Sequence, residues 1–464
     1  MMGMSVETTE AAVPPPAPDS SRQGEKGGTT ARIVYLVRRE GLTSVFASQV
    51  ARRMGAVADA GFEVDVGVFT PLGQWLRRDS RERWHKTLRE LPPSLVGRVR
   101  RFPSLPSRFD LPMTEARLLR WWLKRNERQL SAGTRQIQGR SEFRQTVCII
   151  QCRNATVTRM ALWARRGLPD VKVIFDCRGL VDHEFLYERG QTFSTVPHAL
   201  RRKAEQLGAE QREAALQSDA VFCVSQRMVD YLGREYGVPP EKCLVVPCCV
   251  DVALFAAASA QRQHMRAQLG FGDRFVVCYC GSLARYQLPN ESLGLFRRIR
   301  EIVPSAHFFA VTTAPDAMRS AARDAGVPAD QMTIVSVGPA EVPQYLSAAD
   351  IGLLLREQCA VNEVASPVKF GEYLASGTTV IMSDGIGDFS ELARRERLGL
   401  VLDNRWSKQN SSQRVRGFLE EWMVGRQEYR RRCILNAHAH LDFDAYLPQI
   451  SAAYCKMGID RTCT

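Results

Sequence analysis

The stretch from residue 365 to 377 places a lysine and a glutamate beside a helix start signal. Serine before proline is typical of a helix N-terminus, so we predict Ser366 as the cap and Pro367 as the first helical residue. The free amides at such a terminus attract an anion, and Lys369 adds a formal charge. Glu372 lies on the same helical face, where its carboxylate can accept two hydrogen bonds from the diol of a ribose. These types and spacings predict a nucleoside diphosphate site, the alternative being a surface helix with one Lys–Glu pair.

Two other loops carry groups of the same kind. An apolar run leads into Gly281 and Ser282, where a glycine lets a ligand approach the backbone, and then into the cation Arg285. Another apolar run ends at Arg356, whose guanidinium can bind phosphate oxygens through two parallel hydrogen bonds. We therefore expect several cations to gather around one diphosphate.

The elements that position these residues follow an alternating pattern. From residue 32 to 402, short β-branched or apolar runs alternate with longer amphipathic stretches, which indicates parallel sheets covered by helices. Ligands of such sheets bind beyond the carboxyl ends of the strands, where the residues named above lie. Val337 and Gly338 also follow a run, and we predict that their backbone contacts the base. We expect strands at 33–37, 64–69, 147–151, 171–175, 220–224 and 243–246, and at 275–280, 306–311, 332–335, 351–355, 379–382 and 398–402.

This pattern predicts an α/β protein with two doubly wound, Rossmann-like domains that face a central cleft. The predicted divisions are a disordered N-terminal tail, a first domain on the acceptor side, a second domain that binds the nucleotide, and a helical tail that packs back on the first domain; their bounds are 1–30, 31–256, 257–425 and 426–464.

The formal charge of +13 is unevenly distributed. Residues 31–170 hold 27 Lys and Arg against 12 Asp and Glu. The net positive charge of this part therefore exceeds the net charge of the whole chain. A basic region of this kind is typical of contact with phosphates, and we consider an anionic membrane surface and a merely solvated Arg-rich face as equal alternatives. We do not expect nucleic acid as a partner, because no RNP, KH, zinc-finger or basic-zipper pattern accompanies the charge.

Several classes of protein are not expected. No apolar run approaches the roughly 18 to 20 residues of a membrane-spanning helix, and the first 30 residues lack the pattern of a secretory signal. We therefore expect a cytoplasmic protein, at most peripheral at the inner membrane face. The 13 cysteines are odd in number and several lie in strand-like runs, so we interpret them as reduced thiols. No metal site is predicted, because Asp442 and Asp444 imitate a DxD motif only within the C-terminal helical part.

The order of motifs resembles a known family. The segments YCGSLARY, EVPQYLSAADIGLLLRE and SPVKFGEYLASGTTVIMSDGIGD resemble the nucleotide-binding half of the retaining glycosyltransferases of family 4, which have the GT-B fold. The segments FDCRGL and SDAVFCVSQRMVDYL resemble parts of that family's first domain, so the likeness covers roughly residues 31–403. The resemblance implies sugar transfer from a nucleoside diphosphate sugar, with retention and without a cofactor or required metal. By position, Arg285 and Lys369 would hold the diphosphate and Glu372 the ribose.

One position departs from the family. Its motif has two glutamates separated by seven residues, and Val364 stands where the first is expected. Asn362 or Glu363 could supply the missing contact to the donor sugar. A sugar-nucleotide epimerase or hydrolase of the same fold, or a catalytically silent nucleotide-binding protein, are the alternative functions.

On the acceptor side, polar residues follow the predicted strands of the first domain. They either contact a glycan, lipid-linked or small-molecule acceptor, as in cell-surface polysaccharide or glycoconjugate synthesis, or belong to an interdomain salt-bridge network. These residues are Arg153, Asp176, Arg178, His183 and Glu184. Gly41, which follows the predicted strand 33–37, could provide the close backbone approach that such clefts use.

Overall fold

A computed structural model gives the structure of the chain. It describes residues 31–38, 46–104, 112–131, 134–137, 140–143, 147–403 and 410–459. The predicted tail over 1–30 and the candidate residue Gly41 lie outside the described residues.

The first domain is built on a seven-stranded parallel sheet of order β3-β2-β1-β6-β7-β8-β9. Each predicted strand of this domain is present. The additional strand β3 lies at the edge of the sheet, and its sequence VRRFPS lacks the apolar run by which the others are found. The bounds are β1 Ala31–Arg38, β2 Glu63–Pro71, β3 Val99–Ser104, β6 Val147–Arg153, β7 Val171–Cys177, β8 Ala220–Cys223 and β9 Cys243–Val245, with a separate antiparallel hairpin of β4 Thr134–Ile137 and β5 Arg140–Phe143.

The second domain has a six-stranded parallel sheet of order β12-β11-β10-β13-β14-β15. All of its strands were predicted. They read as continuous apolar runs because helices cover both faces of the sheet, so that successive residues such as Val276, Val277 and Cys278 are all fully buried. The bounds are β10 Phe275–Cys280, β11 Ala306–Val311, β12 Met332–Val335, β13 Ile351–Leu354, β14 Thr379–Ser383 and β15 Gly399–Leu402.

Both sheets have a topological switch point. The strand order reverses between β1 and β6 in the first sheet and between β10 and β13 in the second, and ligands of doubly wound sheets bind outside the carboxyl ends of such strand pairs. Gly281 directly follows β10, and Arg356 follows β13 by two residues. The fold therefore places both at the switch point of the second sheet.

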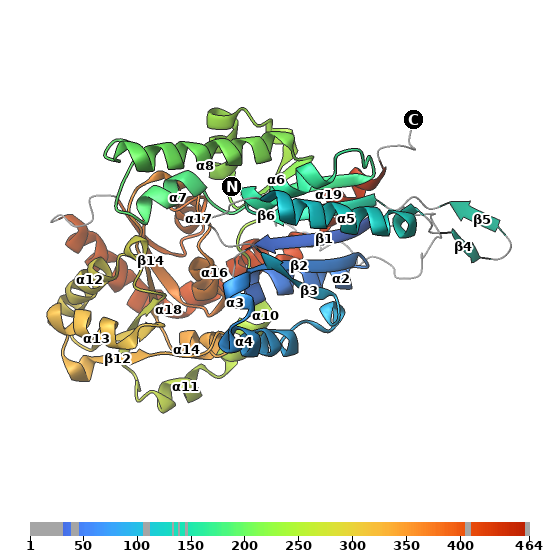
Figure 1. Ribbon diagram of the computed structural model, residues 1–464. Coiled ribbons are helices and arrows are strands. Elements are labelled where there is room, and N and C mark those ends of the chain that lie inside the picture. The colour runs from blue at the N-terminus through green and yellow to red at the C-terminus, as the bar shows by residue number, and fades with distance from the viewer. Residues whose placement is uncertain are drawn as a thin grey trace, which may run out of the picture.

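Helices cover the two sheets and the domains lie side by side (Figure 1). The helices of the first domain are α2 Arg52–Asp59, α3 Leu72–Trp75, α4 Arg78–Arg89, α5 Pro112–Ser131, α6 Ala155–Ala164, α7 Val181–Tyr187, α8 His198–Gln217 and α9 Gln226–Tyr231. Those that follow are α10 Val252–Ala260, α11 Arg262–Gln268, α12 Pro289–Ile302, α13 Pro315–Asp324, α14 Val342–Ser347, α15 Ala360–Glu363, α16 Val368–Ala375 and α17 Phe389–Arg395. Helix α10 spans the predicted boundary at 256, and its Phe255 packs in the core of the second domain.

The C-terminal helices connect the two domains. Helix α18, Asn410–Leu441, packs on the second sheet through Leu419 and Trp422. Helix α19, Leu447–Ile459, packs in the core of the first sheet through Ile450 and Tyr454, and the Tyr454 hydroxyl donates to Gln151 of β6 at 2.5 Å.

The fold also bears on membrane-spanning helices and on the cysteines. Among the described residues, no helix combines the length and apolar character needed to cross a membrane. The twelve cysteines in this part of the chain are all free thiols, as predicted.

Candidate active site

Helix α16 carries Lys369 and Glu372, whose side chains form an ion pair of 2.5 Å. The helix starts one residue later than predicted, because Pro367 is its cap and Val368 its first residue. The Ser366 hydroxyl is engaged elsewhere and accepts a hydrogen bond of 2.9 Å from the amide of Cys248. Gly377 follows the helix with φ of +68°, and its amide donates to the Leu374 carbonyl, which ends the helix.

Tyr373 fixes the position of this helix over the sheet. Its ring lies over Gly352 of β13, where an added Cβ would come within 2.7 Å of the ring, so only glycine allows this approach. Its hydroxyl accepts a hydrogen bond of 2.8 Å from the amide of Cys280 at the end of β10. Lys369, one turn before Tyr373, is thereby held beside Cys280.

The charge of Lys369 is stabilised despite its burial. Burial by itself disfavours the ammonium, but the charge of Glu372 and its hydrogen bond outweigh it, and the pKa of Lys369 lies above its ordinary value. Burial also raises the pKa of Cys280 to about 11, so this thiol is neutral at pH 7. Lys369 therefore stays protonated at pH 7 beside Glu372, and the two side chains are 23% and 15% exposed.

The loop after β10 is shaped by Gly281. This residue has φ of +156°, and an added Cβ would lie 1.9 Å from Oε1 of Gln287. Gln287 in turn donates to the Ser282 hydroxyl at 2.8 Å, and the Tyr279 hydroxyl donates to the Ser282 carbonyl at 2.6 Å. Glycine thus lets the chain turn tightly at the end of the strand.

Arg356 is a buried cation beside the same strand ends. It is 8% exposed, and its Nη1 donates to the neighbouring Leu355 carbonyl at 3.0 Å. Its guanidinium lies 5.2 Å from the ring centre of Tyr286, and no carboxylate of the described residues pairs with it. Burial lowers the pKa of Arg356. A buried guanidinium without a carboxylate is suited to bind a phosphate.

Arg285 contacts the first domain in this structure. Its exposed side chain reaches the first domain, where the guanidinium lies 5.6 Å from the Tyr187 ring centre and against Gly190. The Tyr187 hydroxyl also donates to Glu357 of the second domain at 2.7 Å. Gly281, Arg356 and the Lys369–Glu372 pair therefore lie at or beside the ends of β10 and β13, and Arg285 reaches from the loop after β10 to the first domain.

The loop after β12 lies at the far edge of the second sheet, two strands away from β10. The Gly338 amide donates to the carboxylate of Glu341 at 2.8 Å, and Val337 packs against the core. The contact of their backbone with the base stays a prediction.

Val364 stands where the family motif has its first glutamate, and it and its neighbours Asn362 and Glu363 lie in different environments. Val364 is 2% exposed and packs in a hydrophobic cluster of the first domain. Asn362 is buried and donates to the Glu357 carbonyl at 2.8 Å. Glu363 is exposed and lines a cavity of about 450 Å³ between the domains, which leaves it as the polar side chain of this segment that faces open space.

In the first domain, Asp176 at the end of β7 is the centre of a buried cluster. It accepts from the Tyr35 hydroxyl at 2.5 Å and pairs with Arg178 at 2.9 Å and with Arg53 at 3.2 Å. Burial opposes its charge, but Arg178, Arg53 and Arg153 hold the pKa of Asp176 well below its usual range. Asp176 thus serves as a structural anion for several arginines.

The other acceptor-side candidates lie on α7. The His183 Nε2 is 3.1 Å from the Tyr231 hydroxyl, and its ring packs edge-on against Phe193. Glu184 is exposed, and its carboxylate packs against Gly179. Aromatic packing accounts for His183 without a ligand.

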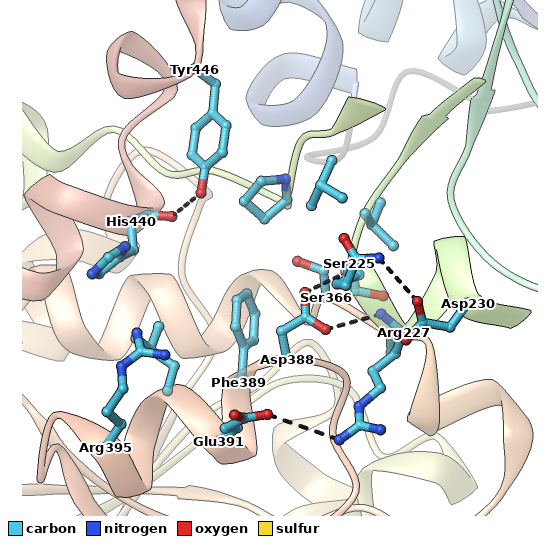
Figure 2. Close-up of a pocket in the computed structure, with 16 residues that line it drawn as sticks. Ser225, Arg227, Asp230, Ser366, Asp388, Phe389, Glu391, Arg395, His440 and Tyr446 are labelled. Carbon is cyan, nitrogen blue, oxygen red and sulfur yellow. Dashed lines mark hydrogen bonds and ion pairs between the residues drawn. The ribbon is translucent and has the colours of Figure 1, made fainter. Parts of the chain in front are cut away.

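A seam of hydrogen bonds joins the domains beside α9. The Asp388 carboxylate of the second domain accepts from the backbone amides of Gln226 and Arg227 of the first, at 2.6 and 3.1 Å. The Ser225 hydroxyl donates to the Val364 carbonyl at 2.8 Å. Figure 2 shows Ser225, Arg227 and Asp388 beside a cavity, with His440 and Tyr446 on the opposite wall, and the volume of this cavity is about 360 Å³. Of the candidate residues, only Ser366 lines this cavity.

Sequence reasoning missed several of these residues. Tyr35 lies within the apolar run of β1 and looks like a core residue, while Tyr187 and Arg53 lie in ordinary helical stretches. Asp388 follows a predicted strand at 379–382, and a carboxylate directly after the glycines Gly385 and Gly387 was the one available signal.

Comparisons with known proteins agree with this geometry. Residues 46–254 match the family model described as Glycosyltransferase Family 4, and residues 261–440 match the model described as Glycosyl transferases group 1. No curated protein matches the chain at a significant level.

Solved structures share the architecture at low identity. A glycosyltransferase from Rickettsia africae has a TM-score of 0.64 at 9% identity, with 94% of this chain and 100% of that chain covered. Anabaena HepE in complex with UDP-glucose has a TM-score of 0.60 at 14% identity, with 92% and 99% covered. WaaG, a glycosyltransferase of lipopolysaccharide biosynthesis, has a TM-score of 0.58 at 14% identity, with 90% and 98% covered.

The two doubly wound parallel sheets and the two family matches define the class of this protein. The chain is a glycosyltransferase of the GT-B fold, and the predicted fold class is confirmed.

Proposed function

We propose that the chain transfers a sugar from a nucleoside diphosphate sugar with retention of configuration and without a metal, as family 4 enzymes do. The observation that carries this proposal is the group of Lys369, Glu372, Gly281 and Arg356 at the switch point of the second sheet. The complexes of HepE with UDP and with UDP-glucose support a donor of this type.

The proposed chemistry relies on charge. Breaking the bond between the sugar and the diphosphate builds negative charge on the leaving oxygen, which Lys369 and Arg356 stabilise more in the transition state than in the ground state. Glu372 would bind the ribose hydroxyls, although its present partner is Lys369 at 2.5 Å. Donor binding must therefore share or replace this ion pair. The acceptor hydroxyl attacks from the face of the leaving phosphate, which assists its deprotonation.

The contact to the donor sugar is assigned to Glu363. Val364 is buried in the first domain and Asn362 is hydrogen-bonded within its loop, whereas Glu363 lines the cavity between the domains. Arg285 would swing from Tyr187 to the diphosphate when the donor binds.

The acceptor is proposed to be a glycan or a lipid-linked sugar of cell-surface polysaccharide or glycoconjugate synthesis, bound by the first domain in the cytoplasm. Helix α5 supports contact with an anionic membrane. Its exposed face carries Leu118 and Trp121, which are 50% and 59% exposed, beside Arg117, Lys124 and Arg125. The Arg125 guanidinium lies 5.4 Å from the Trp121 ring centre. Aromatic and basic residues together are typical of the membrane interface.

The direct test is a transfer assay with a panel of isotope-labelled nucleotide sugars and lipid-linked acceptors. Glu372→Ala should lose on the order of 10² to 10³-fold in rate, as expected for the loss of one preorganised group. Glu301→Ala on the exposed side of α12 is the matched control and should keep full rate. Equal activity of Glu372→Ala and wild type would reject the assignment.

Two alternative functions are distinguished in the same assay. Turnover of the donor without any acceptor would indicate an epimerase or hydrolase. Nucleoside diphosphate binding without turnover of any donor would indicate a catalytically silent protein, for which the burial of Val364 is the favouring observation.

A further inference from the structure

Glu357 is a carboxylate beside the proposed diphosphate site that pairs with neither arginine there. It directly follows Arg356 after β13, yet among the described residues it forms no ion pair with Arg356 or with Arg285. Its carboxylate instead accepts a hydrogen bond of 2.7 Å from the hydroxyl of Tyr187, the last residue of α7 in the first domain. The contact across the cleft therefore occupies the carboxylate while both arginines stay without one.

Tyr187 is also the place where both arginines come near the first domain. The Arg285 guanidinium lies 5.6 Å from its ring centre, and Nη1 of Arg285 would come within 2.7 Å of a Cβ added at Gly190. Tyr187 is close enough to Arg356 to interact electrostatically with its guanidinium. Arg285, Arg356 and Glu357 therefore all lie within reach of this one half-buried phenol.

A carboxylate at this place competes with a diphosphate. Both are anions, and a guanidinium binds either of them through two parallel hydrogen bonds. If the Glu357 carboxylate were released, it could pair with Arg356 or Arg285, and a phosphate would then have to displace it. The hydrogen bond from Tyr187 gives the carboxylate another partner, and it adds no positive charge that would strengthen the hold on the phosphate.

We propose that Tyr187 is a positioning residue that holds Glu357 away from Arg356 and Arg285, so that both cations remain free for the diphosphate of the donor. This inference rests on the proposed function, because it concerns the same donor site. The hydrogen bond joins the two domains, so the arginines are kept free when the domains lie together across the cleft. The first domain thereby supports donor binding through Glu357.

The test is calorimetric titration of full-chain variants with UDP. Tyr187→Phe keeps the ring beside Arg285 but releases Glu357, and UDP affinity should fall about tenfold, the size expected for one hydrogen bond to a charged group. Glu357→Gln should bind UDP at least as tightly as the wild type, because no carboxylate competes. The double variant should therefore regain the affinity of Glu357→Gln.

Tyr429→Phe on α18 is the matched control. The Tyr429 hydroxyl donates to the Glu421 carboxylate at 2.9 Å, so this variant loses a bond of the same kind away from the donor site and should bind UDP as the wild type does. In the transfer assay, Tyr187→Phe should raise the KM of the donor about tenfold and leave kcat unchanged, because a saturating donor displaces the carboxylate.

A crystal structure of Tyr187→Phe without nucleotide should show Glu357 paired with Arg356 or Arg285. A Glu357 carboxylate apart from both guanidiniums would overturn the proposal, as would wild-type UDP affinity in Tyr187→Phe. Equally weak binding by Tyr187→Phe and the double variant would show that Tyr187 is only a structural contact between the domains.

If Tyr187→Phe does not fold, Glu357→Gln decides the question alone, and weaker UDP binding than in the wild type would overturn the proposal. A wild type that binds no UDP would reject the proposed function. The crystal structure of Tyr187→Phe needs no nucleotide, so it still decides whether Tyr187 holds Glu357 away from the arginines.

Discussion

At the scale of single residues, the fold holds the three candidate cations in different ways. Lys369 is paired with Glu372 on its own helix, and this pair was predictable because both residues lie one turn apart in the sequence. Arg356 is buried among tyrosines, and Arg285 reaches Tyr187 of the other domain. The last two environments were not predictable, because their partners come from distant segments whose arrangement only the tertiary fold determines.

The environment of Arg356 predicts that its charge lowers the stability of the free protein and strengthens the binding of UDP. Arg356→Met should stabilise the free protein by about 1 kcal/mol, because it removes a buried charge that no carboxylate compensates. The same change should weaken UDP binding about tenfold or more, since a hydrogen bond to a charged group is worth about 1.5 to 3 kcal/mol. Urea unfolding and calorimetric titration with UDP measure the two effects.

Arg323→Met on the exposed face of α13 is the control and should change neither quantity. A variant Arg356→Met with lower stability and unchanged UDP affinity would show that the guanidinium is a structural group.

At the scale of elements, the strands of the second domain were predictable and the start of α16 was not. The strands are marked by apolar runs that are buried on both faces. The helix starts late because the Ser366 hydroxyl bonds to the Cys248 amide of the linker, a contact between residues 118 positions apart. The edge strand β3 was not predicted, because its sequence contains two arginines and a proline and shows no apolar run.

In the loop after β10, replacing Gly281 with alanine should lower the stability of the chain, whereas the same replacement at a control glycine should raise it. Gly281→Ala should destabilise the chain by about 1 to 3 kcal/mol and reduce UDP binding, because a Cβ strains the backbone and displaces Gln287. Gly294→Ala in α12 meets nothing within 4 Å and should stabilise the chain by about 0.5 to 1 kcal/mol. Thermal unfolding of both variants measures this difference, and two shifts of the same sign would contradict it.

At the scale of the whole molecule, the basic half contains two helical faces of different character. On α4, the cations are paired along the helix: Arg78 with Glu82, Arg83 with Asp79 and Lys86 with Glu90. On α5, the described side chains of Arg117, Lys124 and Arg125 have no such partners, and they surround exposed apolar residues. The sequence predicted the excess charge but could not tell a paired face from an unpaired one.

This difference predicts which face meets a membrane. The triple variant R117Q/K124Q/R125Q should bind anionic vesicles about 10²-fold more weakly, because each cation near the surface contributes about 1 kcal/mol. The triple variant R78Q/R83Q/K86Q removes the same charge and should bind nearly as wild type. Co-sedimentation with phosphatidylserine vesicles at low and high salt measures both. Equal losses of vesicle binding in the two variants would show that net charge alone determines binding. If the wild type does not bind vesicles at low salt, the basic face of α5 is only solvated and does not meet a membrane.

We propose that the strand ends of β10 and β13 and the first turns of α16 bind one nucleoside diphosphate. A crystal structure of the chain soaked with UDP tests it most directly. The expected result is density for the diphosphate in contact with Lys369 and the loop at Gly281, with the ribose on Glu372. Density in the cavity beside Asp388, or a saturating soak that leaves the strand ends empty, would contradict the claim.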